Sequence, residues 1–430
     1  MTAHRTALAP SPGDAVRAEW RAGWTVVAAA GAGIATGPAF YQYVSSLFIG
    51  SIETTYGWSR GDVTLIASLA LIGAFSAPFV GRLADRFGIR RVAMTCMVVV
   101  AIAFFGIASA ANNKWEIAAW TALLGLSAPG ATGLTFSRAV VSWFDRSRGL
   151  ALGSSTAAMN VATVLLSPVL ALIVAGYGFR GGYAALGVLI LLVGLPIVYI
   201  FLHERPVSLR EEGMRFTPEH GAANQPADDA ATAGTVWRSR GFWLLGLGLL
   251  LANVLTAGLL THLVPLLVSL GFSLIAASAL LPVYAASVFV GRLGIGWMFD
   301  HYPANRVSAA FTMLAVTGSV AFLTTMPTLA VYVGILFVGL LQGAETDINA
   351  YFVGRLFPHN LFSTAYGGLY TVGIVGTAVG VIGFGQLHDI FGNYNVAIMI
   401  GAGALTTAAG LFLALGRDLR EARDAQITAH

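Results

Sequence analysis

Apolar runs of about 20 residues, the length that a helix needs to cross a bilayer, recur along this chain between short polar breaks. A helix of that kind satisfies its own backbone hydrogen bonds inside lipid. Only 10% of the 430 residues are charged, whereas soluble domains carry about 25%. So few charges cannot cover a surface that faces water, so most of the surface must face lipid. The sequence therefore predicts an all-α membrane protein.

The apolar runs predict twelve membrane-spanning helices in two groups of six. The first group covers residues 23–50, 62–83, 91–111, 116–142, 149–175 and 181–203. The second group covers residues 240–268, 273–298, 306–326, 329–353, 362–386 and 393–416. A long polar stretch separates the groups. We therefore expect an N-terminal bundle at 1–203, a flexible linker at 204–236 and a C-terminal bundle at 237–430.

Basic residues gather in alternate loops. Arginines fill the loops after the second, fourth, eighth and tenth predicted helices, the linker and both terminal segments. The opposite loops hold only Arg60, Lys114 and Arg180. Basic residues favour the cytoplasmic side of a membrane. We therefore expect a multi-pass protein of the cell inner membrane, a monomer in the lipid bilayer, with both termini and the linker in the cytoplasm.

A short pattern repeats at an offset of 215 residues. Gly81 and Asp85 follow the second predicted helix, and Gly296 and Asp300 follow the eighth. Two parallel repeats of six helices place a substrate site between them, near the middle of the membrane. The repeat thus predicts two pseudo-symmetric bundles around a central site.

Three ionisable residues lie deep inside predicted helices. Arg292 precedes Asp300 by eight residues, about 12 Å along a helix. Glu345 and Asp347 precede Arg355 by ten and eight residues, about 15 and 12 Å. Charges at this depth are costly, so they pair with one another or line a cavity. Only one of the two acids should face the central space, and the pattern leaves open which. The alternative is a static pair of purely structural groups.

The segment 81–91 (GRLADRFGIRR) resembles the loop signature between helices two and three of the major facilitator superfamily. The segment 296–301 (GWMFDH) resembles a degenerate copy of it, with His301 and Pro303 where the signature has Arg and Gly. The resemblance implies the major facilitator fold and transport by alternating access. It also implies gating roles for Gly81, Asp85, Arg86 and Asp300.

Three further segments resemble the monocarboxylate and oxalate carriers of that superfamily: 21–24 (RAGW), 56–60 (YGWSR) and 143–153 (WFDRSRGLALG). This resemblance implies a small organic anion as the substrate and Arg292 as the residue that binds its carboxylate. The monocarboxylate carriers have an Asp four residues before this arginine, where this chain has Val288. We therefore expect Glu345 or Asp347 to pair with Arg292 and to couple transport to protons.

Other polar side chains inside the predicted helices are candidates for lining the substrate site, although each alone more often serves helix packing. They are Tyr41, Tyr43, Asn253, Tyr370 and Arg138. We expect no cofactor and no metal, because the sequence has no phosphate-binding loop, no metal-ligand spacing and a single cysteine, Cys96. We likewise expect no enzymatic activity, since no nucleophile triad appears. A nucleic-acid partner is not expected, because no basic cluster adjoins a soluble fold.

The sequence thus predicts a secondary active transporter that moves small organic anions, in particular monocarboxylates, together with protons. One alternative is a proton-coupled exporter of amphipathic drugs or metabolites, for which Arg292 would be dispensable. Against it, the fifth predicted helix holds only Ser167-Pro168 of the Gly-Pro-rich motif of drug exporters. A second alternative, of another class, is a membrane sensor that keeps the carrier fold without transport.

Overall fold

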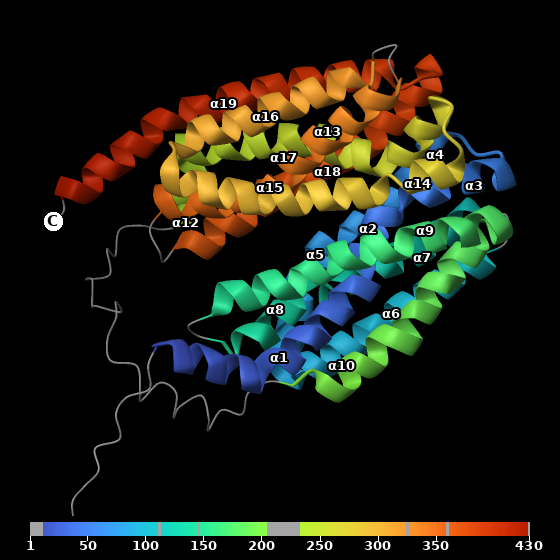
Figure 1. Cartoon of the computed structure of the whole chain (residues 1–430), viewed down its shortest axis with the longest axis horizontal. Coiled ribbons are helices and arrows are strands. Elements are labelled where there is room, and N and C mark those ends of the chain that lie inside the picture. The colour runs from blue at the N-terminus through green and yellow to red at the C-terminus, as the bar shows by residue number, and fades with distance from the viewer. Residues whose placement is uncertain are drawn as a thin grey trace, which may run out of the picture.

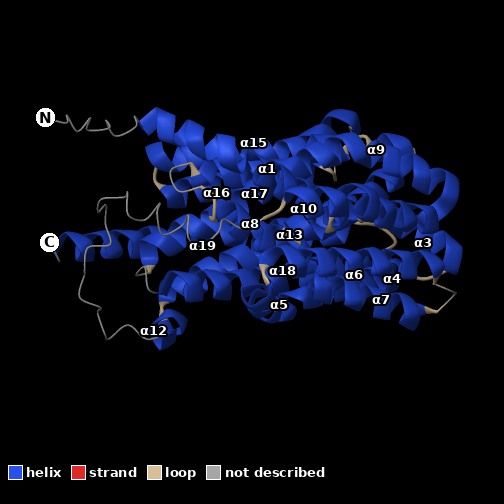
Figure 2. Cartoon of the chain, turned by 90° about the horizontal axis from the view of Figure 1, so that it is seen from below, coloured by secondary structure: helices blue, strands red, loops and turns tan. Residues whose placement is uncertain are grey.

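The computed structural model of the chain describes residues 12–110, 113–144, 147–203, 233–323, 327–357 and 361–428. Within these ranges every regular element is a helix (Figure 2). The helices gather in two bundles, one from each half of the chain (Figure 1). The start of α1 (Pro12–Thr36) and the end of α19 (Asn395–Thr428) lie at the same end of the molecule. We call this end the terminal end and the opposite end the distal end.

The N-terminal bundle contains all helices up to Phe201. They are α1, α2 (Pro38–Val44), α3 (Ser46–Tyr56), α4 (Arg60–Ser68), η1 (Leu69–Ile72), α5 (Gly73–Phe87), α6 (Ile89–Ser109), α7 (Lys114–Ser127), η2 (Ala128–Ala131), α8 (Gly133–Val141), α9 (Arg148–Leu189), η3 (Ile190–Gly194) and α10 (Leu195–Phe201).

The C-terminal bundle follows the predicted linker. Its helices are α12 (Ala233–Arg238), α13 (Arg240–Ser269), α14 (Leu274–Ser278), α15 (Leu281–His301), α16 (Ala304–Ala321), α17 (Pro327–Leu356), α18 (Phe362–Phe391) and α19. Residues 204–232 of the predicted linker lie outside the described residues, and α12 begins within its last four positions.

Nine stretches of the described residues are long and apolar enough to cross a membrane. One of them, Leu150–Phe201, is 52 residues long and makes two crossings, because the backbone at Gly178 (φ 67°, ψ −172°) leaves the helical conformation. The interrupted helix α1–α3 and the 18-residue α16 supply the remaining crossings. The described chain therefore has the predicted two bundles of six crossings, and the predicted fold class is confirmed.

The structure differs from the predicted helices where the chain bends inside the membrane. The helix predicted at 23–50 is interrupted at Gly37, whose extended backbone precedes Pro38, and again at Ser45. Proline lacks a backbone N–H and fits the first turn of a new helix, so α2 begins there. The helix predicted at 181–203 contains a π-helical turn, η3, which ends two residues before Pro196. The breaks at Gly37 and at η3 adjoin prolines, whose effect apolarity alone does not reveal, whereas the break at Ser45 has no proline beside it.

The two bundles touch through α2, α3, α4 and α9 on one side and α13, α14, α15 and α18 on the other. In particular, α4 packs against α18, and α9 packs against α14 and α15. Figure 1 shows the bundles close together at the distal end and diverging toward the terminal end. The structure thus has its distal end closed.

Candidate substrate and proton site

Two glycines bring α15 and α17 into backbone contact. A Cβ atom at Gly291 would collide with the backbone of Leu340, and one at Gly343 would collide with the backbone of Val288. Only glycine allows such a close approach of two helices in a membrane. The approach buries Val288, which is 3% exposed, and sets the height and rotation at which Arg292 meets α17.

Arg292 of α15 lies opposite Asp347 of α17. The distance from Arg292 Nε to Asp347 Oδ2 is 3.8 Å, and each side chain is 38% exposed. Both atoms are buried, and neither has a hydrogen-bond partner in the described part of the chain. A separation of 3.8 Å is too long for a hydrogen bond. The two side chains therefore attract each other electrostatically, and Arg292 Nε and Asp347 Oδ2 can each still form a hydrogen bond to another group.

Glu345, two residues earlier on α17, faces away from this pair and is 7% exposed. Its Oε1 lies 2.8 Å from Thr256 Oγ1 of α13, and its Oε2 accepts a hydrogen bond from Gln342 Nε2 at 3.2 Å. No ion pair to Glu345 is present among the described residues. Since a buried charge without a partner is costly, this surrounding suits a neutral carboxyl group.

The hydroxyl group of Thr256 points to the same conclusion. Thr256 Oγ1 lies within hydrogen-bonding distance of two acceptors, the Ala252 carbonyl oxygen at 3.0 Å and Glu345 Oε1 at 2.8 Å. A hydroxyl has one hydrogen to donate. If that hydrogen bonds to Ala252, the usual bond of a threonine inside a helix, the second contact needs a hydrogen on Glu345. A protonated Glu345 satisfies both contacts.

Tyr43 of α2 brings the N-terminal bundle to this site. Its side chain is 8% exposed and interacts electrostatically with both Arg292 and Glu345. Its ring lies edge-on to Tyr284 of α15, with 6.4 Å between the ring centroids. The Tyr284 hydroxyl in turn donates to Gln342 Oε1 at 3.3 Å. Both bundles therefore contribute to one polar centre.

The other predicted lining residues lie outside this centre. Tyr41 bonds to the Tyr183 hydroxyl at 2.9 Å, inside an aromatic cluster of its own bundle. Asn253 accepts a hydrogen bond from Thr377 Oγ1 at 3.2 Å and so joins α13 to α18. Tyr370 is exposed on α18. Arg138 donates to the Gly81 carbonyl oxygen at 3.4 Å.

The contact of Arg138 with Gly81 ties α8 to the signature loop. In that loop Gly88 (φ 87°) joins α5 directly to α6, a backbone conformation that glycine alone adopts freely. Arg86 is exposed and lies over the ring of Phe87 at 5.3 Å. The side chains of Asp85 and Asp300 lie outside the described ones. The gating roles implied for these residues stay predictions.

Sequence reasoning missed the neutral partners of the two acids. Thr256, Gln342 and Tyr284 contact Glu345 directly or through one another, and Tyr366 interacts electrostatically with Arg292 and Asp347. Polar residues in apolar helices were the available signal, but threonine and tyrosine are too frequent in such helices for it to be selective.

The described chain is thus a multi-pass membrane protein with an ionisable centre to which both bundles contribute. The sequence profile of the Major Facilitator Superfamily matches residues 29–381. The chain therefore belongs to this family. The two relatives described next are both named as transporters.

Known relatives are distant. The chain is 25% identical to Monocarboxylate transporter 13 of Bos taurus over 360 residues, which cover 82% of this chain and 80% of that one. It is 26% identical to the Gentisate transporter of Corynebacterium glutamicum over 376 residues, or 83% and 80% of the two chains. The crystal structure of a mutant of the nucleoside transporter NupG has the same fold, with a TM-score of 0.74, 13% identity and coverage of 91% and 99%.

Proposed function

We propose that the protein is a secondary carrier that moves small organic anions, in particular monocarboxylates, together with protons. The observation that carries this proposal is the state of Arg292. Its buried Nε has no hydrogen-bond partner among the described residues, and the nearest carboxylate stands 3.8 Å away. A guanidinium group binds a carboxylate through two parallel hydrogen bonds, and this one is free to do so.

The two acids take separate roles in this proposal. An incoming carboxylate binds Arg292 and displaces Asp347, which then loses its stabilising cation and takes up a proton. The substrate and the proton are thus bound together, which gives symport. Glu345 keeps its proton in this state, because it is buried and no cation among the described residues pairs with it. Tyr43 positions the substrate from the other bundle.

The relatives support an anionic substrate. One is named as a monocarboxylate transporter and another as a transporter of gentisate, which is itself an aromatic carboxylate. Asp347 would supply from α17 the acid that the position of Val288 on α15 lacks.

Counterflow in proteoliposomes tests the substrate class. Proteoliposomes that contain the purified protein are preloaded with an unlabelled acid. We then measure the uptake of labelled aliphatic and aromatic monocarboxylates, dicarboxylates and an amphipathic cation. We expect exchange of at least one monocarboxylate and none of the cation. Exchange of the amphipathic cation alone would instead support the exporter.

The arginine distribution supports an orientation with the terminal end in the cytoplasm of a cell with an inner membrane. We expect a green fluorescent protein fused after His430 to fluoresce and an alkaline phosphatase fused there to be inactive, because the phosphatase folds only in the periplasm. Phosphatase activity with a dark fluorescent fusion would reverse the orientation.

A further inference from the structure

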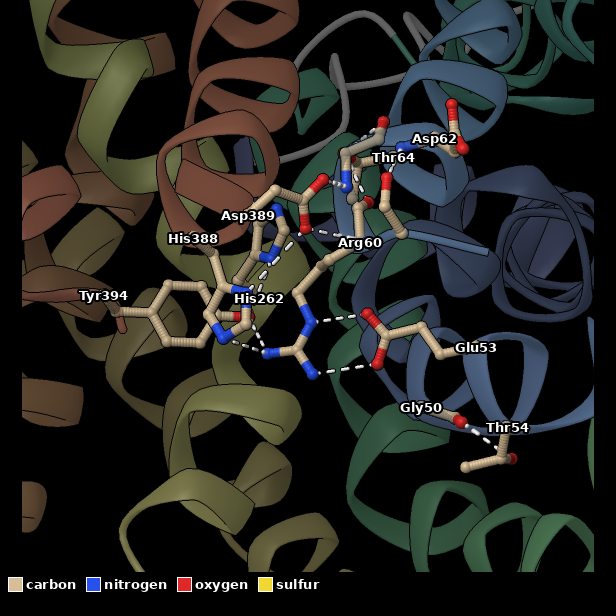
Figure 3. A network of polar contacts seen from close by, with 12 residues as sticks. Gly50, Glu53, Thr54, Arg60, Asp62, Thr64, His262, His388, Asp389 and Tyr394 are labelled. Carbon is tan, nitrogen blue, oxygen red and sulfur yellow. Dashed lines mark hydrogen bonds and ion pairs between the residues drawn. The ribbon is translucent and has the colours of Figure 1, made fainter. Parts of the chain in front are cut away.

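A network of polar side chains joins the two bundles at the distal end (Figure 3). Its centre is Arg60, the first residue of α4. The guanidinium of Arg60 donates two parallel hydrogen bonds to Glu53 of α3, from Nε to Oε1 at 2.5 Å and from Nη2 to Oε2 at 2.8 Å. Its Nη1 reaches the other bundle, where it donates to the Tyr394 hydroxyl at 2.8 Å and to His388 Nε2 at 3.1 Å. One side chain thus binds both bundles.

The network continues into the C-terminal bundle in one direction. His262 of α13 is fully buried, and its Nε2 lies 3.1 Å from the Val381 carbonyl oxygen, which can only accept a hydrogen bond. Nδ1 of the neutral ring is then an acceptor, and Tyr394 donates to it at 3.0 Å. Donation therefore runs from Arg60 to Tyr394, then to His262 and finally to Val381. Every polar group in this series is satisfied.

The backbone of α4 makes a second connection to the other bundle. The first N–H groups of a helix have no partner within it. Here the Arg60 N–H donates to Asp389 Oδ1 at 3.1 Å, and the Gly61 N–H donates to Asp389 Oδ2 at 2.7 Å. A carboxylate is favoured at a helix N-terminus by the helix dipole as well. The start of a helix in one bundle is therefore held by a side chain of the other.

Glycines make this approach possible. A Cβ atom at Gly385 of α18 would lie 3.1 Å from Gly61 Cα and 3.2 Å from the Arg60 carbonyl oxygen. A larger side chain at Gly385 would therefore push α4 and α18 apart. Gly383 on the same helix has no atom within 4 Å of the corresponding position. The close packing is thus specific to the residues that face the network.

We propose that Asp389 and Arg60, with the Gly61–Gly385 contact between them, form a latch that keeps the distal end closed and that must break whenever this end opens. A transporter with alternating access has to separate these bundles at the distal end in each cycle. The latch links residues 328 and 329 positions apart in the sequence. It is independent of the substrate that the central site takes, so it goes beyond the proposed function.

A neighbouring ion pair provides a comparison. Lys114 and Asp62 are 2.5 Å apart at the same end, but both belong to the N-terminal bundle and are 44% and 40% exposed. Asp62 lies in the same helical turn as Arg60. Replacing Asp62 with asparagine removes one negative charge, as the same change at Asp389 does, but it leaves the contacts between the bundles in place.

Cysteine labelling tests the latch without any substrate. In a protein whose single cysteine is removed by Cys96→Ala, Ser45→Cys places a thiol in a small cavity that Trp58 and Val63 of one bundle and Thr261 of the other also line. Ser45 precedes Glu53 by eight residues, about 12 Å inward along the helix direction. A membrane-impermeant maleimide is added on the side that the reporter fusions assign to the distal end.

We expect Asp389→Asn and Gly385→Val each to raise the labelling rate at least about tenfold, the first by removing charge-assisted hydrogen bonds and the second by wedging the helices apart. The matched controls, Asp62→Asn and Gly383→Val, should label within about twofold of the parent. Labelling of both latch variants at the parent rate would overturn the proposal, as would equally fast labelling of the controls. The two variants act by different physical means, since one weakens hydrogen bonds and the other forces helices apart. Faster labelling of both could therefore not be explained by a local structural defect in one of them.

Discussion

Replacing Arg292 with lysine is expected to lower carboxylate uptake about a hundredfold, because lysine keeps the positive charge but cannot make two parallel hydrogen bonds to one carboxylate. Charge-assisted hydrogen bonds contribute about 1.5–3 kcal/mol each, and about 1.4 kcal/mol corresponds to a factor of ten in affinity. The loss should appear in KM and in kcat/KM. The measurement is initial uptake by proteoliposomes over a range of substrate concentrations.

Arg306→Lys is the matched control. Arg306 is an exposed arginine of α16, outside the central site, so this variant should retain uptake. If Arg292→Lys transported carboxylates within about threefold of the wild type, Arg292 would not be the residue that binds the carboxylate. The anion would then have to be held elsewhere.

Asp347→Asn should abolish accumulation driven by a proton gradient while leaving exchange of substrate intact. Asparagine cannot take up the proton when the substrate displaces it from Arg292, so the gradient no longer drives net uptake. Exchange needs only the binding of the anion and the movement of the bundles. The measurement is accumulation with about pH 5.5 outside and about pH 7.5 inside, compared with counterflow without a gradient.

Glu345→Gln distinguishes the two acids. A glutamine amide can donate to Thr256 and accept from Gln342, which are the hydrogen bonds that a protonated Glu345 makes. If Glu345 holds its proton throughout, this variant should still accumulate substrate. Loss of accumulation in Glu345→Gln with normal accumulation in Asp347→Asn would move the coupling proton to Glu345.

The fold could be predicted because the bilayer imposes the length and apolarity of each crossing. The depths of Arg292, Glu345 and Asp347 followed from the fixed rise of a helix. Which acid meets Arg292 did not follow, because the rotation of α17 against α15 depends on the contacts of Gly291 and Gly343. Those contacts are invisible in a sequence where glycine occurs 51 times.

The latch could not have been predicted from the sequence either. In the sequence, Arg60 is only a basic residue of an outer loop and part of a short motif. Its partners His388 and Asp389 lie 328 and 329 positions later in the chain. Their contact exists only while the distal end is closed. A pattern within one segment carries no information about such a contact, because the contact depends on how the two bundles are placed against each other.

The contact of Gly61 with Gly385 also bears on how abruptly the distal end opens. Dispersion attraction falls by up to about half when a gap of about 1 Å forms, and the hydrogen bonds to Asp389 are lost soon afterwards. A slightly separated interface therefore retains little of the stabilisation of the closed one. Distances measured across the distal end of single molecules should accordingly fall into two separate populations with few intermediate values, as expected of a bistable interface.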